Sequence, residues 1–133
     1  MIKLSPVPLV RNAADILYDL LKERPAVANI SHKTMPTWNE HCAFIASNPY
    51  LAWYIIQDAE SKPLGAIYLT RAREIGIFIF RVHHRKGYAA QAVSELLTKW
   101  PGTCYANIAP GNTASIAFFE ALGARHIQNT YQL

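Results

Sequence analysis

The sequence is poor in cysteine and glycine, with two and six among 133 residues, and it has no long uninterrupted apolar run. Because the apolar stretches are only of strand length, a membrane-spanning helix is not expected. The first six residues lack a basic segment followed by a long apolar run, which argues against a secretory signal. Cys42 and Cys104 lie far apart in apolar contexts, which favours buried thiols in a reducing compartment over a disulfide scaffold. We therefore expect a cytoplasmic protein that has no membrane partner.

Charge is sparse as well, since 17% of the residues are charged and 51% are hydrophobic. This balance is typical of a globular protein, and the length fits one domain over residues 1–133. The formal net charge is +4, which fits nucleic acid, an anionic cofactor or no particular partner. Because the sequence has no recognised nucleic-acid reader motif and no long Lys/Arg stripe, a nucleic-acid partner is not expected.

The N-terminal half predicts a strand, two helices and a hairpin. Pro6 and Pro8 restrict the first apolar segment to a sheet edge. An apolar stripe at helical spacing follows Asn12, a candidate N-cap. Thr37 and Glu40 have the spacing of a capping box. The expected elements are an edge strand within residues 2–9, a helix from Asn12 to Pro25, a helix from Thr37 to about Ser47, and a hairpin of Ala52–Gln57 with Leu64–Thr70.

The C-terminal half predicts an alternation of strands and helices. Residues Glu74–Val82 are nearly all hydrophobic, which indicates a central strand covered on both faces. The apolar period becomes helical from Gly87 to Trp100. Strand Thr103–Ile108, helix Asn112–Leu122 and strand Arg125–Leu133 follow. The order β-α-α-β-β-β-α-β-α-β predicts an α/β fold with helices packed on a mixed sheet.

The turn between residues 82 and 87 is unusually basic, with His83, His84, Arg85 and Lys86 in a row. Positive charge is disfavoured at a helix N-terminus by about 0.3–1 kcal/mol per exposed residue. The turn has no Ser, Thr, Asp or Asn to cap the first amides, so an anion bound there would satisfy them. Gly87 would let the anion approach the backbone closely. The alternative is a loop of solvated surface charges, and the absence of Walker and Gly-x-Gly-x-x-Gly motifs argues against nucleoside triphosphates and dinucleotides.

Two segments resemble the GNAT family of N-acetyltransferases. Residues 74–93, with His84-Arg85-Lys86-Gly87-Tyr88-Ala89, are similar to the acetyl-CoA motif of that family, an Arg/Gln-x-x-Gly-x-Gly/Ala turn after its fourth strand. They are most similar to the branch that acetylates ribosomal-protein N-termini. Residues 107–123 resemble the family's C-terminal block, Asn-x-x-Ser-Ile followed by Leu-Gly. The resemblance implies a GNAT fold: a mixed, mostly antiparallel sheet with a splayed strand pair and flanking helices.

The resemblance also implies acetyl-CoA as co-substrate and a set of residues that contact it. Amides of the basic turn would hold the pyrophosphate, and main-chain groups of the preceding strand would pair with pantetheine like an added strand. The pantetheine arm would enter where this strand splays from Thr103–Ile108. Asn112 would contact the cofactor, although it is also a plausible N-cap of the last helix. The expected contacts are Phe78, Ile79, Phe80, Arg85, Lys86, Gly87, Tyr88, Ala89, Ala90, Gln91 and Asn112.

Three residues or segments depart from the family pattern. His84 stands where members usually have Arg or Gln, which weakens a phosphate contact or makes it depend on pH. Phe119 stands where many members carry a tyrosine that protonates the leaving thiolate. The chain ends at Leu133, before the family's usual last strand, so the sheet edge is either open or completed by a partner subunit in a homodimer.

Glu74 is the candidate catalytic residue, since a carboxylate at a similar position deprotonates the amine in some members. The alternative is an exposed glutamate at a strand end. Residues 30–41 lie where the family forms its acceptor wall, or form a loop before a capped helix. His32, His41 and Cys42 lack the spacing of a zinc site, and His83 and His84 are poorly placed for one ion, so no metal is expected.

Three functions are compatible with these features. The first is transfer of acetyl from acetyl-CoA to a primary amine, on a small molecule or a peptide N-terminus. The second is a module of GNAT shape that binds and senses acyl-CoA without turnover, which Phe119 and the short C-terminus favour. The third is nucleic-acid binding through the basic surface.

Overall fold

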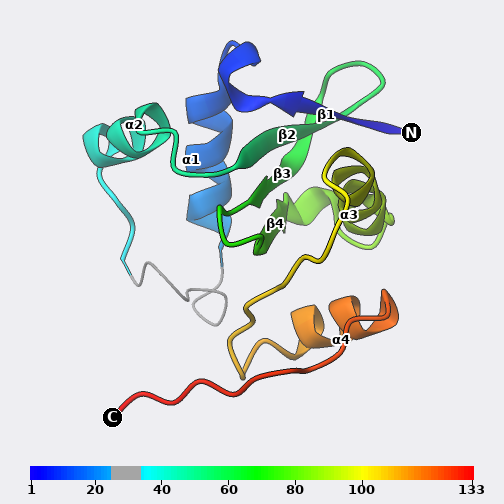
Figure 1. Ribbon diagram of the computed structural model, residues 1–133. Coiled ribbons are helices and arrows are strands. Elements are labelled where there is room, and N and C mark those ends of the chain that lie inside the picture. The colour runs from blue at the N-terminus through cyan, green and yellow to red at the C-terminus, as the bar shows by residue number, and fades with distance from the viewer. Residues whose placement is uncertain (25–33) are drawn as a thin grey trace.

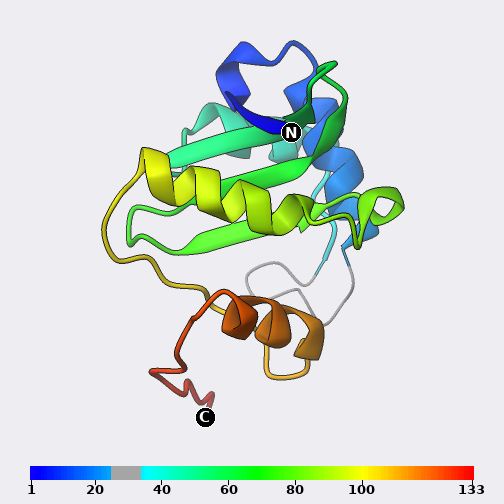
Figure 2. The same ribbon diagram turned by 90° about the vertical axis from the view of Figure 1, so that its right-hand side faces the viewer.

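The computed structural model describes residues 1–24 and 34–133. A four-stranded sheet has the order β1-β2-β3-β4, and every neighbouring pair is antiparallel. Helix α3 lies on one face of this sheet and α1 on the other, and α4 lies beyond the β4 edge (Figures 1 and 2). The strands are β1 (Ile2–Pro6), β2 (Ala52–Asp58), β3 (Pro63–Leu69) and β4 (Ile75–Ile79). The helices are α1 (Ala13–Glu23), α2 (Trp38–Ala46), α3 (Tyr88–Lys99) and α4 (Thr113–Ala121), with single 3-10 turns η1 (Val7–Leu9) and η3 (Arg81–His83).

Apolar side chains are buried on both faces of the sheet. Ile55 and Ile56 are neighbours in β2, so they point to opposite faces, and both are fully buried. Ile56 packs in the cluster that includes Leu96 of α3, and Ile55 packs in the cluster that includes Leu17 of α1. The sheet is therefore the middle of three layers, which confirms the expected α/β architecture.

Several local predictions are confirmed. The capping box of α2 is complete, since Glu40 N–H donates to Thr37 Oγ1 at 3.1 Å and Thr37 N–H donates to Glu40 Oε1 at 2.8 Å. The hairpin turn closes on Asp58, whose Oδ1 accepts from the amides of Glu60 and Lys62. Asn12 is the N-cap of α1 by position, but its side chain makes no capping bond.

Two strand predictions are wrong. Residues 103–108 pair with β4 only through one parallel bridge, between Tyr105 and Glu74. Beyond Tyr105 the chain leaves the edge of β4, so no ladder of hydrogen bonds forms. Residues 125–133 form no strand, and all of them are exposed. They have strand-compatible side chains, but a strand needs a neighbouring edge to pair with, and none of the described strands reaches them.

β4 was expected to be central, and it is instead the last strand of the described sheet. All five of its residues are only partly buried. Ile75, Ile77 and Ile79 pack against the core on the α3 side, whereas Phe78 faces the α1 side. Its continuous hydrophobicity therefore reflects one core face and one face that lines a cleft.

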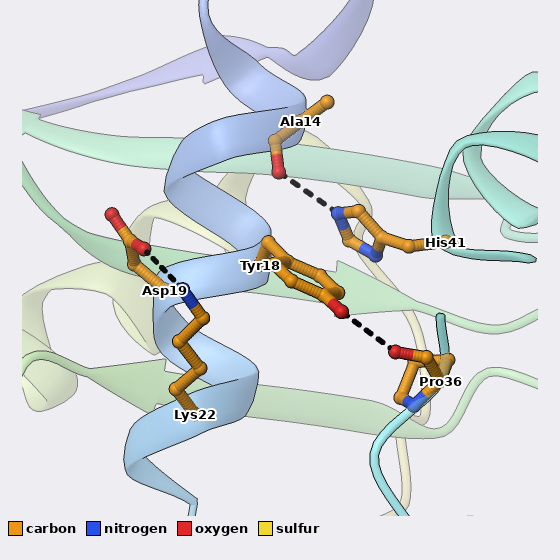
Figure 3. A network of polar contacts seen from close by, with 6 residues as sticks. All are labelled: Ala14, Tyr18, Asp19, Lys22, Pro36 and His41. Carbon is orange, nitrogen blue, oxygen red and sulfur yellow. Dashed lines mark hydrogen bonds and ion pairs between the residues drawn. The ribbon is translucent and has the colours of Figure 1, made fainter. Parts of the chain in front are cut away.

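Hydrogen bonds from two aromatic residues attach α2 and the segment before it to α1 (Figure 3). His41 Nε2 donates to the carbonyl oxygen of Ala14 at 2.8 Å. The Tyr18 hydroxyl donates to the carbonyl oxygen of Pro36 at 2.8 Å. The rings of Tyr18 and His41 also contact each other, with centroids 4.9 Å apart. This network fixes the position of α2 and the preceding segment relative to α1.

Two stacked tyrosines connect the loop after α2 to the sheet. The rings of Tyr50 and Tyr68 are 4.0 Å apart and nearly parallel, at 5°. Trp53 contacts Tyr50 edge-on at 4.8 Å. Burial raises the pKa of both tyrosines, and their mutual interaction raises that of Tyr50 further. Both phenols are therefore neutral at physiological pH.

No helix among residues 1–24 and 34–133 is long and apolar enough to cross a membrane.

Cys42 and Cys104 are both free, and each is half-buried rather than buried as expected.

Leu96 and Leu97 provide a matched test of the core. Leu96 is fully buried, whereas Leu97 is 40% exposed. We expect Leu96→Ala to lower the free energy of unfolding by about 2–5 kcal/mol, because it removes buried methyl groups and leaves a cavity. Leu97→Ala is expected to change it by less than about 1 kcal/mol. Urea denaturation measures both values, and equal losses would contradict the assignment of the α3 face.

The tyrosine pair predicts alkaline instability. Because the folded-state pKa values of Tyr50 and Tyr68 are raised, their contribution to stability is complete below the unfolded-state pKa of about 10 and is lost as pH rises through the folded-state values. We expect two of the seven tyrosines to ionise only as the protein unfolds, as followed by absorbance at 295 nm.

Replacing both Tyr50 and Tyr68 by Phe should remove the late phase of the titration, in which these two tyrosines ionise as the protein unfolds. Tyr131→Phe, which changes a tyrosine that is 83% exposed, should leave the late phase in place. A late phase that survives the double replacement would contradict the assignment.

Candidate functional site

A cleft of about 1070 Å³ opens along β4. One wall consists of the C-terminal end of α1, the N-terminal part of α2 and the sheet, and the other consists of residues 107–109 and the start of α4. The walls meet at the bridge between Glu74 and Tyr105. There the Ile75 N–H donates to the Tyr105 carbonyl at 2.7 Å, and the Tyr105 N–H donates to the Arg73 carbonyl at 2.8 Å. The cleft is therefore the space where β4 and the following segment diverge.

Arg73 holds this junction in place. Its Nε donates to the Thr103 carbonyl at 2.8 Å, and its Nη2 donates to the Trp100 carbonyl at 2.8 Å and to the Pro101 carbonyl at 3.1 Å. Its φ of 64° lies in the left-handed region, which is uncommon for a residue other than glycine. These contacts tie the end of α3 to the turn between β3 and β4.

The main-chain groups of β4 alternate between β3 and the cleft. The Phe80 N–H donates to the Leu64 carbonyl at 2.9 Å, and the Ile75 N–H points away from β3, toward Tyr105. In an antiparallel pair this alternation repeats every two residues. Phe78 and Phe80 therefore turn their main-chain groups toward β3, and Ile77 and Ile79 turn theirs toward the cleft. Of the three strand residues expected to pair with pantetheine, Ile79 is the one with outward main-chain groups.

His84 occupies part of this outward edge. Its Nε2 donates to the Ile79 carbonyl at 2.8 Å, and the residue lines the cleft. His84 lies in the basic turn as predicted. The sequence contains no signal for its hydrogen bond to the Ile79 carbonyl.

The basic turn has the backbone expected of an anion site. Gly87 is the N-cap of α3 with φ 80°, no side chain caps the helix, and the first turn contains no acidic residue. Arg85 has a φ of 63° and Lys86 does not have a positive φ, so the sign alternates from Arg85 to Gly87. Alternation of this kind forms backbone nests that bind anions. None of residues 85–91 lines the cleft itself, which reaches the turn only as far as His84.

Glu74 lies at the junction of the two walls, and its carboxylate is oriented from both sides. Asn107 Nδ2 donates to Oε2 at 2.5 Å, and the Thr70 hydroxyl donates to Oε1 at 3.3 Å. Its backbone N–H donates to Thr70 Oγ1 at 3.0 Å. All three residues line the cleft. Because each carboxylate oxygen has a second lone pair, Glu74 retains the capacity to accept a proton.

The wall opposite α4 is largely aromatic. Phe44, Tyr50, Trp53, Tyr68 and Phe78 line it. The Arg24 guanidinium lies 5.8 Å from the Phe78 ring centroid, and burial lowers the pKa of Arg24 from its ordinary value. Within the expected acceptor wall, Met35, Pro36, Glu40 and His41 line the cleft, while residues 30–33, with His32, lie outside the described residues.

Asn112 and Phe119 line the cleft from α4. The Asn112 side-chain oxygen accepts from the Ser115 N–H at 3.2 Å, which confirms the N-cap interpretation and leaves the amide Nδ2 to face a ligand. Phe119 contacts Phe118 edge-on at 5.0 Å and presents no acid.

The site residues that were not predicted from the sequence include Arg24, Tyr50, Tyr68, Thr70 and Asn107. The one available signal was the sharing of a strand face, since Tyr68 and Thr70 alternate in the predicted hairpin strand. The other three reach the cleft through turns and long-range packing.

No group of three or more His, Cys, Asp or Glu side chains in the described part of the chain is arranged to hold a metal ion.

His83 is buried, and burial together with the nearby charges of Lys86 and Lys62 lowers its pKa.

Solved acetyltransferase structures share this fold. An acetyltransferase from Thermus thermophilus matches with a TM-score of 0.75 at 19% identity, over 97% of this chain and 90% of that chain. A Vibrio cholerae spermidine N-acetyltransferase in complex with CoA and spermine matches with 0.72 at 19% identity, over 92% and 79%. A GNAT superfamily phosphinothricin acetyltransferase from Sinorhizobium meliloti in complex with AcCoA matches with 0.65 at 22% identity, over 92% and 73%.

Among curated proteins, none matches this sequence. The family model of the acetyltransferase (GNAT) domain matches residues 7–125, most of the chain and both segments that carry the sequence resemblance. The fold and the divergent strand edge agree with this match. The chain therefore belongs to the GNAT acetyltransferase family.

Proposed function

We propose that this protein is an N-acetyltransferase, a single domain over residues 1–133 that transfers acetyl from acetyl-CoA to a primary amine by direct attack and uses no metal. The observation that carries the proposal is the junction at Glu74, where an outward strand edge and an oriented carboxylate meet in one cleft. We propose a cytoplasmic location, since acetyl-CoA and free thiols are compatible with a reducing compartment.

The donor would bind along the outer edge of β4. Main-chain groups of Ile77 and Ile79 face the cleft and can pair with the amides of pantetheine like an added strand. The diphosphate would lie on amides of residues 85–91 at the start of α3, where helix dipole and nest geometry both favour an anion. The Asn112 amide group faces the same cleft and is available to the cofactor.

The acceptor would enter from the side of α1 and α2. Glu74 takes a proton from the ammonium group, and the neutral amine attacks the acetyl carbonyl carbon. The bonds from Thr70 and Asn107 orient the carboxylate for this task. Because GNAT neighbours include proteins named for spermidine and phosphinothricin, a small-molecule amine is the first acceptor class to test. A peptide N-terminus, as in the ribosomal-protein branch, is the second.

A second candidate function is an acyl-CoA sensor without turnover. It is favoured by Phe119, an apolar residue on the α4 wall of the cleft. Calorimetry with acetyl-CoA and thiol release with a panel of amines separate the two functions, since a sensor binds the donor and releases no thiol.

Gly87 and Gly123 provide a matched pair for donor binding. Both have positive φ, and a Cβ added at either position would meet no close neighbour. Alanine at either residue costs about 1–2 kcal/mol of backbone energy. Only Gly87→Ala is expected to weaken CoA binding, by about five- to thirtyfold, because it reduces the population of the binding-competent turn.

Isothermal titration calorimetry measures the affinity, and the rise in Tm with CoA provides an independent value. Equal weakening by Gly87→Ala and Gly123→Ala would contradict the location of the diphosphate.

Glu74→Gln tests the base. We expect kcat/KM to fall by about 10²–10⁴-fold, because the amide cannot accept the proton from the ammonium. The affinity for acetyl-CoA should change little, since Glu74 lies on the side of the sheet from which the acceptor is proposed to enter. Glu60→Gln, in the exposed hairpin turn, is the control. If kcat/KM stays within a few-fold across all pH values, another group deprotonates the amine.

A further inference from the structure

The proposed reaction releases a thiolate that an acid in the cleft can protonate, and this inference rests on the acetyltransferase function proposed above. When the amine attacks the acetyl group, the C–S bond breaks and sulfur leaves as a thiolate. Phe119 on the α4 wall carries no proton to give. Another group in the cleft must supply the proton, or the thiolate must leave unprotonated.

The register of the sheet brings one phenol to the junction. Tyr68 pairs with Gly76 in the ladder between β3 and β4, and Ala66 pairs with Phe78. Cross-strand partners lie on the same face, and Ala66 packs in the α1-side cluster with Phe78. Tyr68 therefore lies on the acceptor side of the sheet, as does Glu74 two residues before Gly76.

The absence of a side chain at Gly76 lets the Tyr68 ring extend over β4. A Cβ added at Gly76 would overlap the ring carbon Cζ of Tyr68 and its hydroxyl oxygen. The φ of Gly76 is not in the left-handed region, so this glycine is required by space and not by backbone conformation. The phenol oxygen thus lies against the strand whose outer edge is proposed to hold the thioester.

Tyr50 holds the ring in this position. The two rings stack at 4.0 Å, and both residues line the cleft. The role of an acid requires the phenolic proton of Tyr68. The raised pKa of Tyr68 keeps this proton on the phenol at physiological pH.

The other polar groups at the junction are less suited to this role. The Thr70 hydroxyl donates to Glu74 and accepts from the Glu74 amide. The Asn107 amide also donates to Glu74 and is not an acid. The His41 Nε2 proton is used by the Ala14 carbonyl.

We propose that Tyr68 is the acid that protonates the departing CoA thiolate, in place of the hydroxyl that Phe119 lacks. Glu74 takes the first proton from the ammonium, the amine nitrogen forms its bond to the acetyl carbon, and the C–S electron pair leaves on sulfur. Sulfur takes the phenolic proton of Tyr68. The second amine proton is lost as the amide forms and reprotonates the Tyr68 phenolate, and Glu74 returns its proton to solvent.

Tyr68→Phe tests the proposal, because it removes only the hydroxyl and retains the stack. With acetyl-CoA and the best amine from the panel, kcat should fall by about 10²-fold or more. KM for acetyl-CoA and the calorimetric affinity for CoA should stay within about threefold of the wild type. Tyr54→Phe, on the other face of the sheet in β2, is the control and should change kcat by less than about threefold.

The rescue variant adds Phe119→Tyr to Tyr68→Phe. With a phenol on the α4 wall, the double variant should have a kcat at least about tenfold higher than that of Tyr68→Phe. If the role of Tyr68 were purely structural, adding this phenol would not raise kcat. Loss of CoA affinity in parallel with kcat, or kcat within threefold of the wild type, would overturn the role of Tyr68 while leaving the acetyltransferase function in place. A wild-type protein that releases no thiol with any amine would overturn the proposed function, and the role of Tyr68 with it.

Discussion

The shape of the cleft depends on the contacts of Arg73. Its guanidinium binds the main-chain carbonyls of Trp100, Pro101 and Thr103, and its own carbonyl accepts from Tyr105. A planar cation with five donors is suited to collecting several carbonyls at the end of a helix. Among the described residues, the main-chain bonds between this segment and the β4 edge are those of Tyr105, and the residues after it form the opposite wall. One turn residue therefore sets where the two walls separate.

The pleat of β4 lets five residues serve two purposes. Ile75, Ile77 and Ile79 anchor the strand to the α3 core with their side chains, while the main-chain groups of Ile77 and Ile79 face the cleft. Gly76 and Phe78 belong to the acceptor side. A strand edge whose side chains are anchored in this way can accept a ligand without losing its position in the sheet.

The features that the sequence predicted well are those with local causes. The capping box of Thr37, the Asp58 turn and the start of a helix at Gly87 each depend on residues within four positions. Predictions failed where pairing partners are distant in sequence. Residues 103–108 and 125–133 have strand composition, but composition does not show whether an edge is available. Likewise, the stack of Tyr50 on Tyr68 depends on the packing of the loop before β2 against β3, and nothing in the spacing of the two residues indicates it.

The bond from His84 to the Ile79 carbonyl has a thermodynamic consequence. A ligand that pairs with this carbonyl replaces an existing hydrogen bond instead of satisfying an empty acceptor. The net gain at that point is therefore small, since one protein–protein bond is exchanged for one protein–ligand bond. If CoA binds as proposed, its affinity must then come mainly from apolar contact of the pantetheine arm and from the charged end of the molecule. The imidazole that is released becomes available to interact with that same end.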